Sequence, residues 1–276
     1  MKIDGWKYYN HAAIPTTAPH TKVNLEPIEN NTIWKKLDGG GYCLLARWSS
    51  DWDCGYETEW WYCIKDSPFD LTSLKAKRRY EINKGKKNFR IEKIDPMNYI
   101  NDLYMVTVLA YSAWPEKYRP VVKKNEFNEQ IKVWKSLDIF AAFSLETDEL
   151  KGYALLNDYD SFVEFSILRT IPEAEKLAIN AALVEGILEN YKERFDGKFY
   201  INDGSRTIHH ETAFQDYLEK YFNFRKAYCR LNIKYRPGVG LLIKLLYPFR
   251  RHIDSNTHLG NKLLGVLKME DIRRNC

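Results

Sequence analysis

Three apolar runs separated by short polar turns constrain the fold of this chain most strongly. The runs are IFAAFSLE, LKGYALLND and FVEFSILR, and together they span residues 139–169. Connections this short join neighbouring strands into an antiparallel meander. A long helix with one apolar face is expected next, over 173–191, followed by a strand at 198–203. A meander that feeds a crossover helix predicts an α+β fold with a mixed, largely antiparallel sheet, rather than a doubly wound parallel sheet.

Further elements are expected on both sides of the meander. Two apolar runs near the start, at 42–50 and 58–66, are separated by the turn segment DWDCGYE and read as a β-hairpin. The tail interleaves Leu and Ile with Lys and Arg, which predicts two amphipathic helices. The remaining expected elements are helices at 71–84, ending at Gly85, and at 97–114, 126–134 and 212–222, strands at 88–94 and 224–235, and tail helices at 239–251 and 256–268.

Charge is concentrated in two zones. Residues 75–90 contain eight basic residues and one acid, and residues 236–276 contain eight basic residues and three acids, although the whole chain has a net charge of only +5. Two basic zones on an otherwise acidic chain suit an anionic partner, such as a phosphorylated cofactor, a nucleic acid or an acidic membrane. Solvated helix faces give the same pattern, and the sequence leaves both readings open.

Several classes of protein are excluded or disfavoured. No apolar run approaches the roughly 20 residues needed to span a bilayer, and the start MKIDGWKYYN has no signal-peptide core. We therefore expect a cytoplasmic chain. Five cysteines without a CxxC pair argue against a zinc ribbon or a disulfide framework.

The order of these elements, with three local segments, resembles the GNAT acyltransferase superfamily, and within it the Fem-like branch of peptidoglycan-bridge and polysaccharide-biosynthesis acyltransferases. The likeness covers roughly residues 70–235. It implies three parts: an N-terminal extension with a β-hairpin (1–69), which could be a degenerate half-domain, a GNAT-like acyltransferase domain (70–236) and a basic amphipathic tail (237–276). The three segments are SLKAKRRYEINKGKKNFRIEKI, KGYALLNDYDSFVEFSILRTIPEAEKLAINAALVEGILENY and FYINDGSRTIHHETAFQDYLEKYFNFRKA.

The resemblance implies acetyl-CoA or another acyl-CoA as the donor. Many GNAT enzymes have a glycine-rich pyrophosphate loop before the long helix, whereas this chain has EAEKLAINAA there. Glycines let backbone N–H groups close around phosphates, so their absence keeps aminoacyl-tRNA open as the alternative donor.

Acyl transfer to an amine requires removal of a proton from the amine, stabilisation of an oxyanion and protonation of the leaving group. Glu164 lies in an apolar strand, where a carboxylate can act as a base, and Asp203 follows a strand at a turn opened by Gly204. Tyr217 is the candidate general acid. Structural readings compete with these roles: a strand hydrogen bond for Glu164, a local cap for Asp203 and core packing for Tyr217.

Binding roles are expected for a wider set of polar residues. Asn180 lies in the apolar part of the long helix and suits either a pantetheine-like arm or a buried hydrogen bond. The adjacent pair His209 and His210 points apart on a helix or a strand, so we expect no metal. The expected substrate-binding or cofactor-binding residues are Asn180, Asn202, Ser205, Arg206, His209, Arg78 and Lys84.

The leading hypothesis is an acyl-CoA-dependent N-acyltransferase that acts on an amino sugar or another cell-envelope or polysaccharide precursor. The expected partners are a small or lipid-linked saccharide acceptor, a tRNA if the donor is an aminoacyl-tRNA, and the inner face of the membrane through the tail. The alternatives are a Fem-like aminoacyltransferase and a non-catalytic nucleic-acid-binding or scaffold protein on a degenerate GNAT fold.

Overall fold

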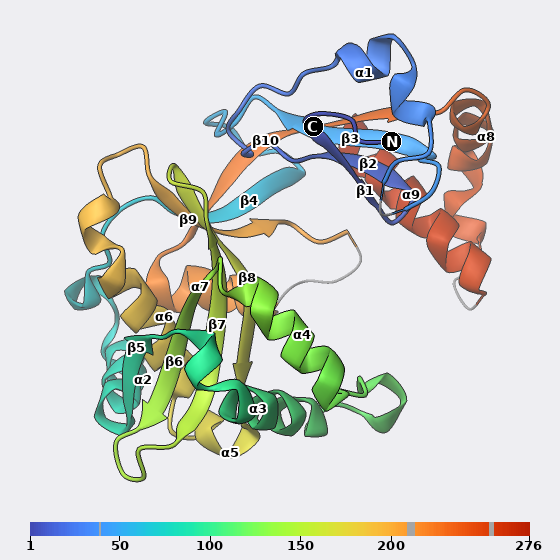
Figure 1. Ribbon diagram of the computed structural model, residues 1–276. Coiled ribbons are helices and arrows are strands. Elements are labelled where there is room, and N and C mark those ends of the chain that lie inside the picture. Colours follow the sequence, from blue (N-terminus) through green and yellow to red (C-terminus); the bar gives the residue numbers. More distant parts are fainter. Residues whose placement is uncertain (39, 209–212, 254–256) are drawn as a thin grey trace. The chain divides into compact units, whose positions relative to one another are not determined.

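The chain forms two compact units in the computed structural model, which describes residues 1–38, 40–208, 213–253 and 257–276 (Figure 1). The first unit consists of the described residues within 1–62, 205–212 and 226–276, and the second of those within 63–204 and 213–225. This division differs from the three consecutive segments expected from the sequence, because strands far apart in the chain pair within the first unit.

The second unit contains the predicted meander. Its strands follow the order β9-β8-β7-β6-β5, and the pairs from β5 to β8 are all antiparallel, whereas β9 runs parallel to β8. The expected α+β class is therefore confirmed. The strands are β5 (Phe89–Lys93), β6 (Asp138–Ser144), β7 (Leu150–Asp158), β8 (Phe162–Thr170) and β9 (Tyr200–Ser205).

Helices cover both faces of this sheet, and strand β7 shows why. The Tyr153 hydroxyl bonds Thr107 of α3 (Ile100–Ser112), 2.7 Å away. A Cβ on the preceding residue, Gly152, would lie 3.0 Å from Ile179 of α6 (Ile179–Asn190). Because successive residues of a strand point to opposite faces, α3 and α6 lie on opposite sides of the sheet.

The helix after β8 is broken. The sequence predicts one helix over 173–191, but the chain forms a short helix α5 (Pro172–Glu175) and then α6. Ala178 separates them with a left-handed φ of +64°. An L-residue in that conformation cannot continue a right-handed helix, so the prediction of a single helix is wrong.

Helix α2 (Ala76–Asn88) packs against α6 at a glycine. A Cβ on Gly85 would lie 2.5 Å from the Ala178 carbonyl oxygen and 2.9 Å from the Ala182 nitrogen. The sequence placed a helix end at this glycine, but the helix continues for three further residues. Glycine serves here for close backbone approach rather than for termination.

The first unit contains strands in the order β1-β2-β3-β10-β4. Its strands are β1 (Trp6–Tyr9), β2 (Ala12–Pro15), β3 (Leu45–Ser50), β10 (Arg225–Tyr235) and β4 (Trp60–Lys65), of which β4 and β10 continue into the second unit. Strands β1 and β2 form an N-terminal hairpin whose turn, Asn10 and His11, has positive φ at both positions. Sequence patterns predicted no strands there.

The hairpin expected from 42–50 and 58–66 is wrong in its pairing. Both strands exist as β3 and β4, but β10 pairs antiparallel with β3 and lies between them. The register places Ser50 opposite Arg230 and Leu45 opposite Tyr235. A short turn favours a local hairpin, whereas the strand that pairs with β3 comes from far along the chain.

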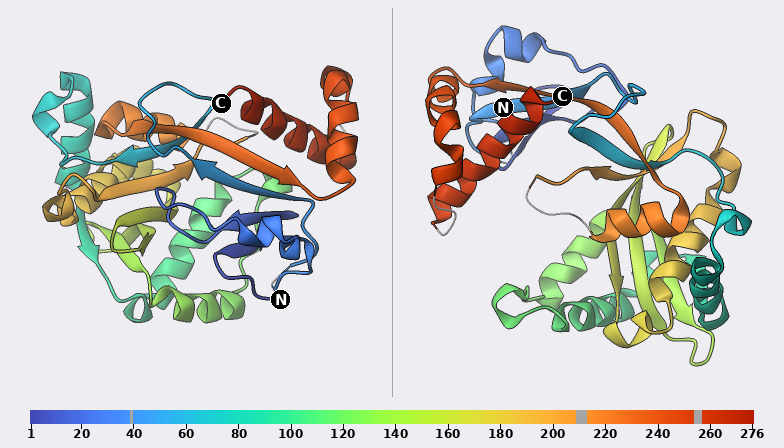
Figure 2. Two further views of the ribbon diagram at one scale, coloured as in Figure 1. Left: turned by 90° about the horizontal axis from the view of Figure 1, so that it is seen from above. Right: turned by 180° about the vertical axis from the view of Figure 1, so that it is seen from behind.

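The tail is helical, as predicted, with shifted boundaries. Helix α8 (Val239–Leu246) continues into the 3₁₀ helix η6 (Tyr247–His252), and α9 (His258–Arg274) follows. These helices lie beside β10 in the first unit (Figure 2). Among the described residues, no helix combines the length and apolar character needed to cross a bilayer.

The other helices are α1 (Glu26–Glu29), α4 (Lys124–Trp134), α7 (Ala213–Phe222) and the short η1 (Thr32–Trp34), η2 (Leu71–Ser73), η3 (Pro96–Asn98), η4 (Glu116–Tyr118) and η5 (Lys192–Arg194).

The close contact of α2 with α6 yields a stability prediction. The variant Gly85→Ala should lower the free energy of unfolding by about 1–3 kcal/mol, because the new methyl group forces the two helix backbones apart. Asn83→Ala, on the exposed face of α2, is the matched control and should stay within about 0.5 kcal/mol of wild type. Urea unfolding measures both variants. An unchanged or increased stability of Gly85→Ala would show that the two helices are not packed this closely.

Candidate active site

The candidate site lies where β8 and β9 stop pairing. The parallel ladder has three residue pairs and ends at Glu164 opposite Asn202. One residue of β8, Ser166, is left unpaired by a register shift against β7. A bulge bends the strand that carries it. Beyond Glu164, within the described residues, the edge of β8 that faces β9 has no ladder partner in β9.

A buried amide joins the two strand ends. The Asn202 side chain is fully buried; its Nδ2 donates to Glu164 Oε1 at 3.3 Å, and its Oδ1 accepts from the Gly204 N–H at 2.8 Å. Gly204 has the predicted positive φ, +87°. Asn202 therefore fixes the turn that immediately follows Asp203.

Helix α7 supports Asp203 from the other side. Gln215, which is 3% exposed, donates from Nε2 to the Asp203 carbonyl oxygen at 3.2 Å and to the Gly204 carbonyl oxygen at 3.5 Å. Glu164, Asn202 and Asp203, all predicted as site residues, are thus brought together with Gln215.

The electrostatics make Asp203 a weak acid. Burial raises the pKa of Asp203 to about 7, and the Glu164 charge adds to the rise, while a hydrogen bond with Gln215 opposes it. A negative charge on Glu164 disfavours ionisation of Asp203. A carboxyl group with this pKa can both accept and release a proton near neutral pH, as a general base requires.

Tyr217 lies in a different cluster. Its ring centroid is 4.8 Å from that of Tyr221 and 5.7 Å from that of Phe222, and burial raises its pKa, with Glu81 of α2 adding to the rise. It follows Gln215 by two positions on α7, and residues two apart leave a helix on different faces. This packing fits the structural reading of Tyr217 better than a direct role beside Asp203.

The other predicted binding residues are dispersed. Arg78 of α2 lies over the Tyr221 ring at 6.0 Å, and Lys84 is half-buried on the same helix. Asn180 accepts a hydrogen bond from Thr170 Oγ1 at 3.2 Å, which fits its reading as a buried hydrogen bonder. Ser205 ends β9 and belongs to the first unit.

Arg206 also belongs to the first unit, where its Nη1 donates to Glu59 Oε2 and to the Glu59 carbonyl oxygen, both at 2.7 Å. This ion pair already engages one nitrogen of the guanidinium that was expected to hold an anionic substrate group. His209, the remaining predicted residue, lies outside the described residues.

Sequence reasoning missed a half-buried arginine in the second unit. Arg169 of β8 donates from Nη1 to the Tyr153 hydroxyl at 2.7 Å and from Nη2 to the Tyr111 hydroxyl, and it lies 4.8 Å from the Tyr111 ring centroid. Among the described residues, no carboxylate forms an ion pair with it. An arginine within the apolar run FSILRT was the available signal, because such a cation is rarely buried without a partner.

The donor-binding features are mixed. The unpaired edge of β8 offers backbone N–H and C=O groups to an extended arm. The segment 171–178, where GNAT enzymes hold a pyrophosphate, contains no glycine and places Glu173 and Glu175 in the first turn of α5. These carboxylates make the segment a poor setting for a phosphate, although Lys176 follows them. No cluster of metal-ligating side chains occurs among the described residues.

Comparisons with known proteins bear on the fold. No protein-family model and no curated protein matches the chain. The solved structure of L-PGS from Bacillus licheniformis is similar over 89% of this chain and 84% of its own, with 14% identity and a TM-score of 0.55. The C-terminal domain of a protein titled as a lysylphosphatidylglycerol synthetase, from Agrobacterium fabrum, covers 87% of this chain and 82% of its own, with 13% identity and a TM-score of 0.51.

A structure of FemX covers 69% of this chain and 65% of its own at 11% identity, with a TM-score of 0.47. The first two likenesses extend over most of both chains and show that this chain shares the fold of those two proteins. At such low identity the comparisons establish the fold and leave the activity to the site.

The raised pKa of Asp203 gives a prediction for stability against pH. Because the folded pKa of about 7 exceeds the ordinary value of 3.8, the folded state holds this proton more tightly. The stabilisation is complete below about pH 4 and is lost as the pH rises to about 7, at up to roughly 1.4 kcal/mol per pH unit.

Asp203→Asn removes this titration. Wild type and variant should therefore have similar free energies of unfolding at low pH, and the variant should be the more stable of the two above pH 7. Asp216→Asn, which is exposed on helix α7, is the control. Parallel pH profiles for wild type and Asp203→Asn would refute the raised pKa.

Proposed function

We propose that this chain transfers an acyl group from an aminoacyl-tRNA to an amine or hydroxyl group of a cell-envelope precursor. The observation that carries the proposal is Asp203, a carboxyl group with a pKa of about 7 at the point where two parallel strands separate. The GNAT-like fold supports acyl transfer as the class of reaction.

Asp203 supplies the proton transfers in this scheme. Its carboxylate takes a proton from the attacking nitrogen or oxygen, which forms a bond to the carbonyl carbon of the donor. The tetrahedral intermediate then breaks its bond to the tRNA ribose oxygen, and the protonated Asp203 returns the proton to that leaving oxygen. Backbone N–H groups on the unpaired edge of β8 are suited to stabilise the intermediate oxyanion.

Helix α2 supports a tRNA donor. Lys75, Lys77 and Lys87 are exposed, and among the described residues no carboxylate pairs with them or with Lys84. The helix flanks α7, which contacts Asp203 through Gln215, since Arg78 lies over Tyr221 of α7. A row of unpaired cations beside the site is the electrostatic footprint expected for a phosphate backbone.

An acyl-CoA donor is the second candidate. The unpaired edge of β8 favours it, because an extended pantetheine arm can add to a strand edge through main-chain hydrogen bonds. The acidic segment before α6 disfavours it, since Glu173 and Glu175 lie where the pyrophosphate would bind. An activity assay with both donors separates the two candidates.

The acceptor is proposed from the expected envelope role. One protein with a similar fold is named a lysylphosphatidylglycerol synthetase. Lysylphosphatidylglycerol is an amino acid attached to a phospholipid. A lipid-linked saccharide or a phospholipid headgroup both offer the required nucleophile. An acceptor of this kind would place the reaction at the cytoplasmic face of a membrane.

The activity test uses aminoacyl-tRNAs carrying radiolabelled amino acids, with an envelope-lipid extract as acceptor. Asp203→Asn should lower kcat by about 10²–10⁴, the usual contribution of a positioned proton-transfer group. In the wild type, the rate should rise with pH through a midpoint near 7, the pKa of Asp203.

Asp216→Asn is the control and should retain wild-type turnover. If label is transferred from acyl-CoA but not from aminoacyl-tRNA, the proposed donor is wrong and acyl-CoA takes its place, while the proposed role of Asp203 is unaffected. Full turnover with an unchanged pH profile in Asp203→Asn would remove Asp203 from the mechanism.

The donor surface has its own test. The double variant Lys77→Gln/Lys87→Gln should weaken tRNA binding, and it should flatten the plot of log affinity against log salt by about 0.7–0.9 for each phosphate that is no longer neutralised. Lys117→Gln/Lys135→Gln, which removes exposed charges elsewhere in the second unit, should bind like wild type. Equal affinities and slopes for both variants would exclude α2 as the tRNA surface.

A further inference from the structure

Helix α8 and the 3₁₀ helix after it expose a continuous apolar surface in the first unit. Leu241, Leu242, Leu245 and Phe249 are 64%, 52%, 61% and 61% exposed, and we call them the apolar ridge. Their spacing places them along one side of the helical segment. Ile243, on the opposite side of α8, is buried at 4% and attaches the helix to the body of the unit. Contiguous exposed apolar side chains mark an interaction surface.

Basic side chains accompany the apolar ridge. Lys244 lies within it, Arg251 follows it and both are exposed. The whole segment 236–276 carries eight basic residues against three acids. A helical surface that combines large apolar side chains with Lys and Arg is complementary to an anionic membrane interface, where apolar groups enter the acyl boundary and cations meet lipid phosphates.

A cavity of about 380 Å³ lies against α8 on the side that carries Ile243, away from the ridge. Four cations and one carboxylate line it, giving a net charge of +3, and Gly240 and Ile243 of α8 form part of its wall. The charged lining residues are Lys234, Lys244, Arg273, Arg274 and Glu270. A cavity of this charge suits a phosphate group.

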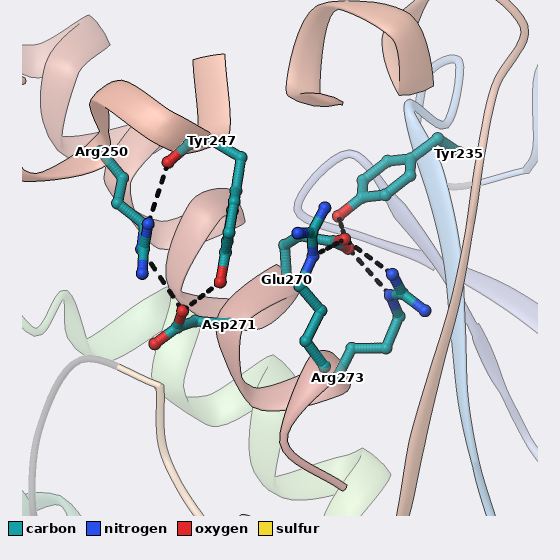
Figure 3. A network of polar contacts seen from close by, with 7 residues as sticks. Tyr235, Tyr247, Arg250, Glu270, Asp271 and Arg273 are labelled. Atoms are coloured by element: carbon teal, nitrogen blue, oxygen red, sulfur yellow. Dashed lines mark hydrogen bonds and ion pairs between the residues drawn. The ribbon is translucent and has the colours of Figure 1, made fainter. Parts of the chain in front are cut away.

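The single carboxylate organises this cavity. Glu270 is 3% exposed; both its oxygens accept from Arg273, at 2.7 and 2.9 Å, and Oε1 also accepts from Arg274 Nε at 2.8 Å (Figure 3). The Tyr235 hydroxyl donates to Glu270 Oε2 at 3.0 Å. Although burial by itself raises the pKa of Glu270, these hydrogen bonds lower it to about 2, so the carboxylate stays charged.

The arginines keep unused donors. Among the described residues, neither Arg273 Nη1 nor the two Nη groups of Arg274 have a hydrogen-bond partner, and no carboxylate pairs with Lys234 or Lys244. The Arg274 guanidinium is held in place by the Tyr247 ring, 3.8 Å away, while Asp271 accepts from Tyr247 and pairs with Arg250 at 3.3 Å (Figure 3). The two arginines are thus held in position by Glu270 and by the Tyr247 ring.

We propose that the apolar ridge docks on the surface of a membrane containing anionic phospholipids, and that the cationic cavity against the same helix binds the phosphate of one lipid headgroup. This surface goes beyond the proposed transfer reaction. It is built entirely from residues of the first unit, whereas Asp203 and helix α2 belong to the second. A binding measurement without donor or acceptor therefore tests it separately from the reaction.

Flotation with vesicles tests the surface directly. Wild-type protein should bind vesicles of phosphatidylcholine mixed with phosphatidylglycerol, bind vesicles of phosphatidylcholine alone much more weakly, and lose affinity as salt is raised. Leu241→Asn/Leu245→Asn should reduce binding by about tenfold or more, because two apolar anchors no longer enter the bilayer. Val133→Asn/Leu145→Asn, which changes two exposed apolar residues of the second unit, is the matched control and should bind like wild type.

The cavity is tested by Lys234→Gln/Lys244→Gln. This variant should bind anionic vesicles about fivefold more weakly for each charge removed and should lose most of the preference over neutral vesicles. The α2 variant Lys77→Gln/Lys87→Gln should keep vesicle binding, and the cavity variant should keep tRNA binding. Thermal unfolding should be unchanged in all of these variants, because the replaced side chains are exposed.

Three outcomes would overturn the proposal. In the first, wild-type protein does not float with anionic vesicles, and in the second, the ridge variant floats as well as wild type. In the third outcome, inorganic phosphate raises the unfolding temperature through Lys234 and Lys244 while vesicles do not bind, which would make the cavity a site for free phosphate.

Discussion

The short parallel ladder between β8 and β9 is the interaction on which the candidate site depends. It ends after three pairs, at Glu164 and Asn202, so Asp203 is the first residue of β9 beyond it. The buried Asn202 side chain donates to Glu164 at the end of the ladder and accepts from the Gly204 N–H in the following turn. These two hydrogen bonds fix the backbone on which Asp203 lies. A longer ladder would satisfy the edge of β8 with hydrogen bonds to β9. Because the ladder ends at Asn202, the unpaired backbone of β8 and the weakly acidic Asp203 occur at the same end of the ladder.

Local patterns predicted most of the second unit. The period-two apolar runs specify β6, β7 and β8, and the chain order of strands and helices was enough to indicate the GNAT-like fold. The sequence also predicted Glu164, Asn202 and Asp203 as candidate site residues, because a polar residue in an apolar strand and a glycine turn after a strand are local signals. Gln215 was not among the candidates, since only the packed structure shows that it bonds the Asp203 and Gly204 carbonyl groups.

The errors share a physical cause. Intrinsic preference favours a helix end at Gly85 and one long helix over residues 173–191. In the structure, α2 continues past Gly85 where it packs against α6, and the long helix is broken at Ala178 in the same contact. The pairing of β3 was predicted from turn length, but β3 pairs with β10, a strand from the far end of the chain. Tertiary contacts between distant residues override local preference, and one sequence alone does not reveal them.

The discontinuous first unit has a consequence for how the chain is made. Strand β3 needs β10, and the Asn232 side chain that bonds Ser50 is 182 residues further along the chain. A ribosome delivers the N-terminal strands long before their partners, while every segment of the second unit except α7 emerges as one continuous stretch. In the nascent chain, β3 therefore has an unpaired, aggregation-prone edge until synthesis reaches β10. Chaperone demand during translation should be set by these early strands rather than by the sheet that carries Asp203.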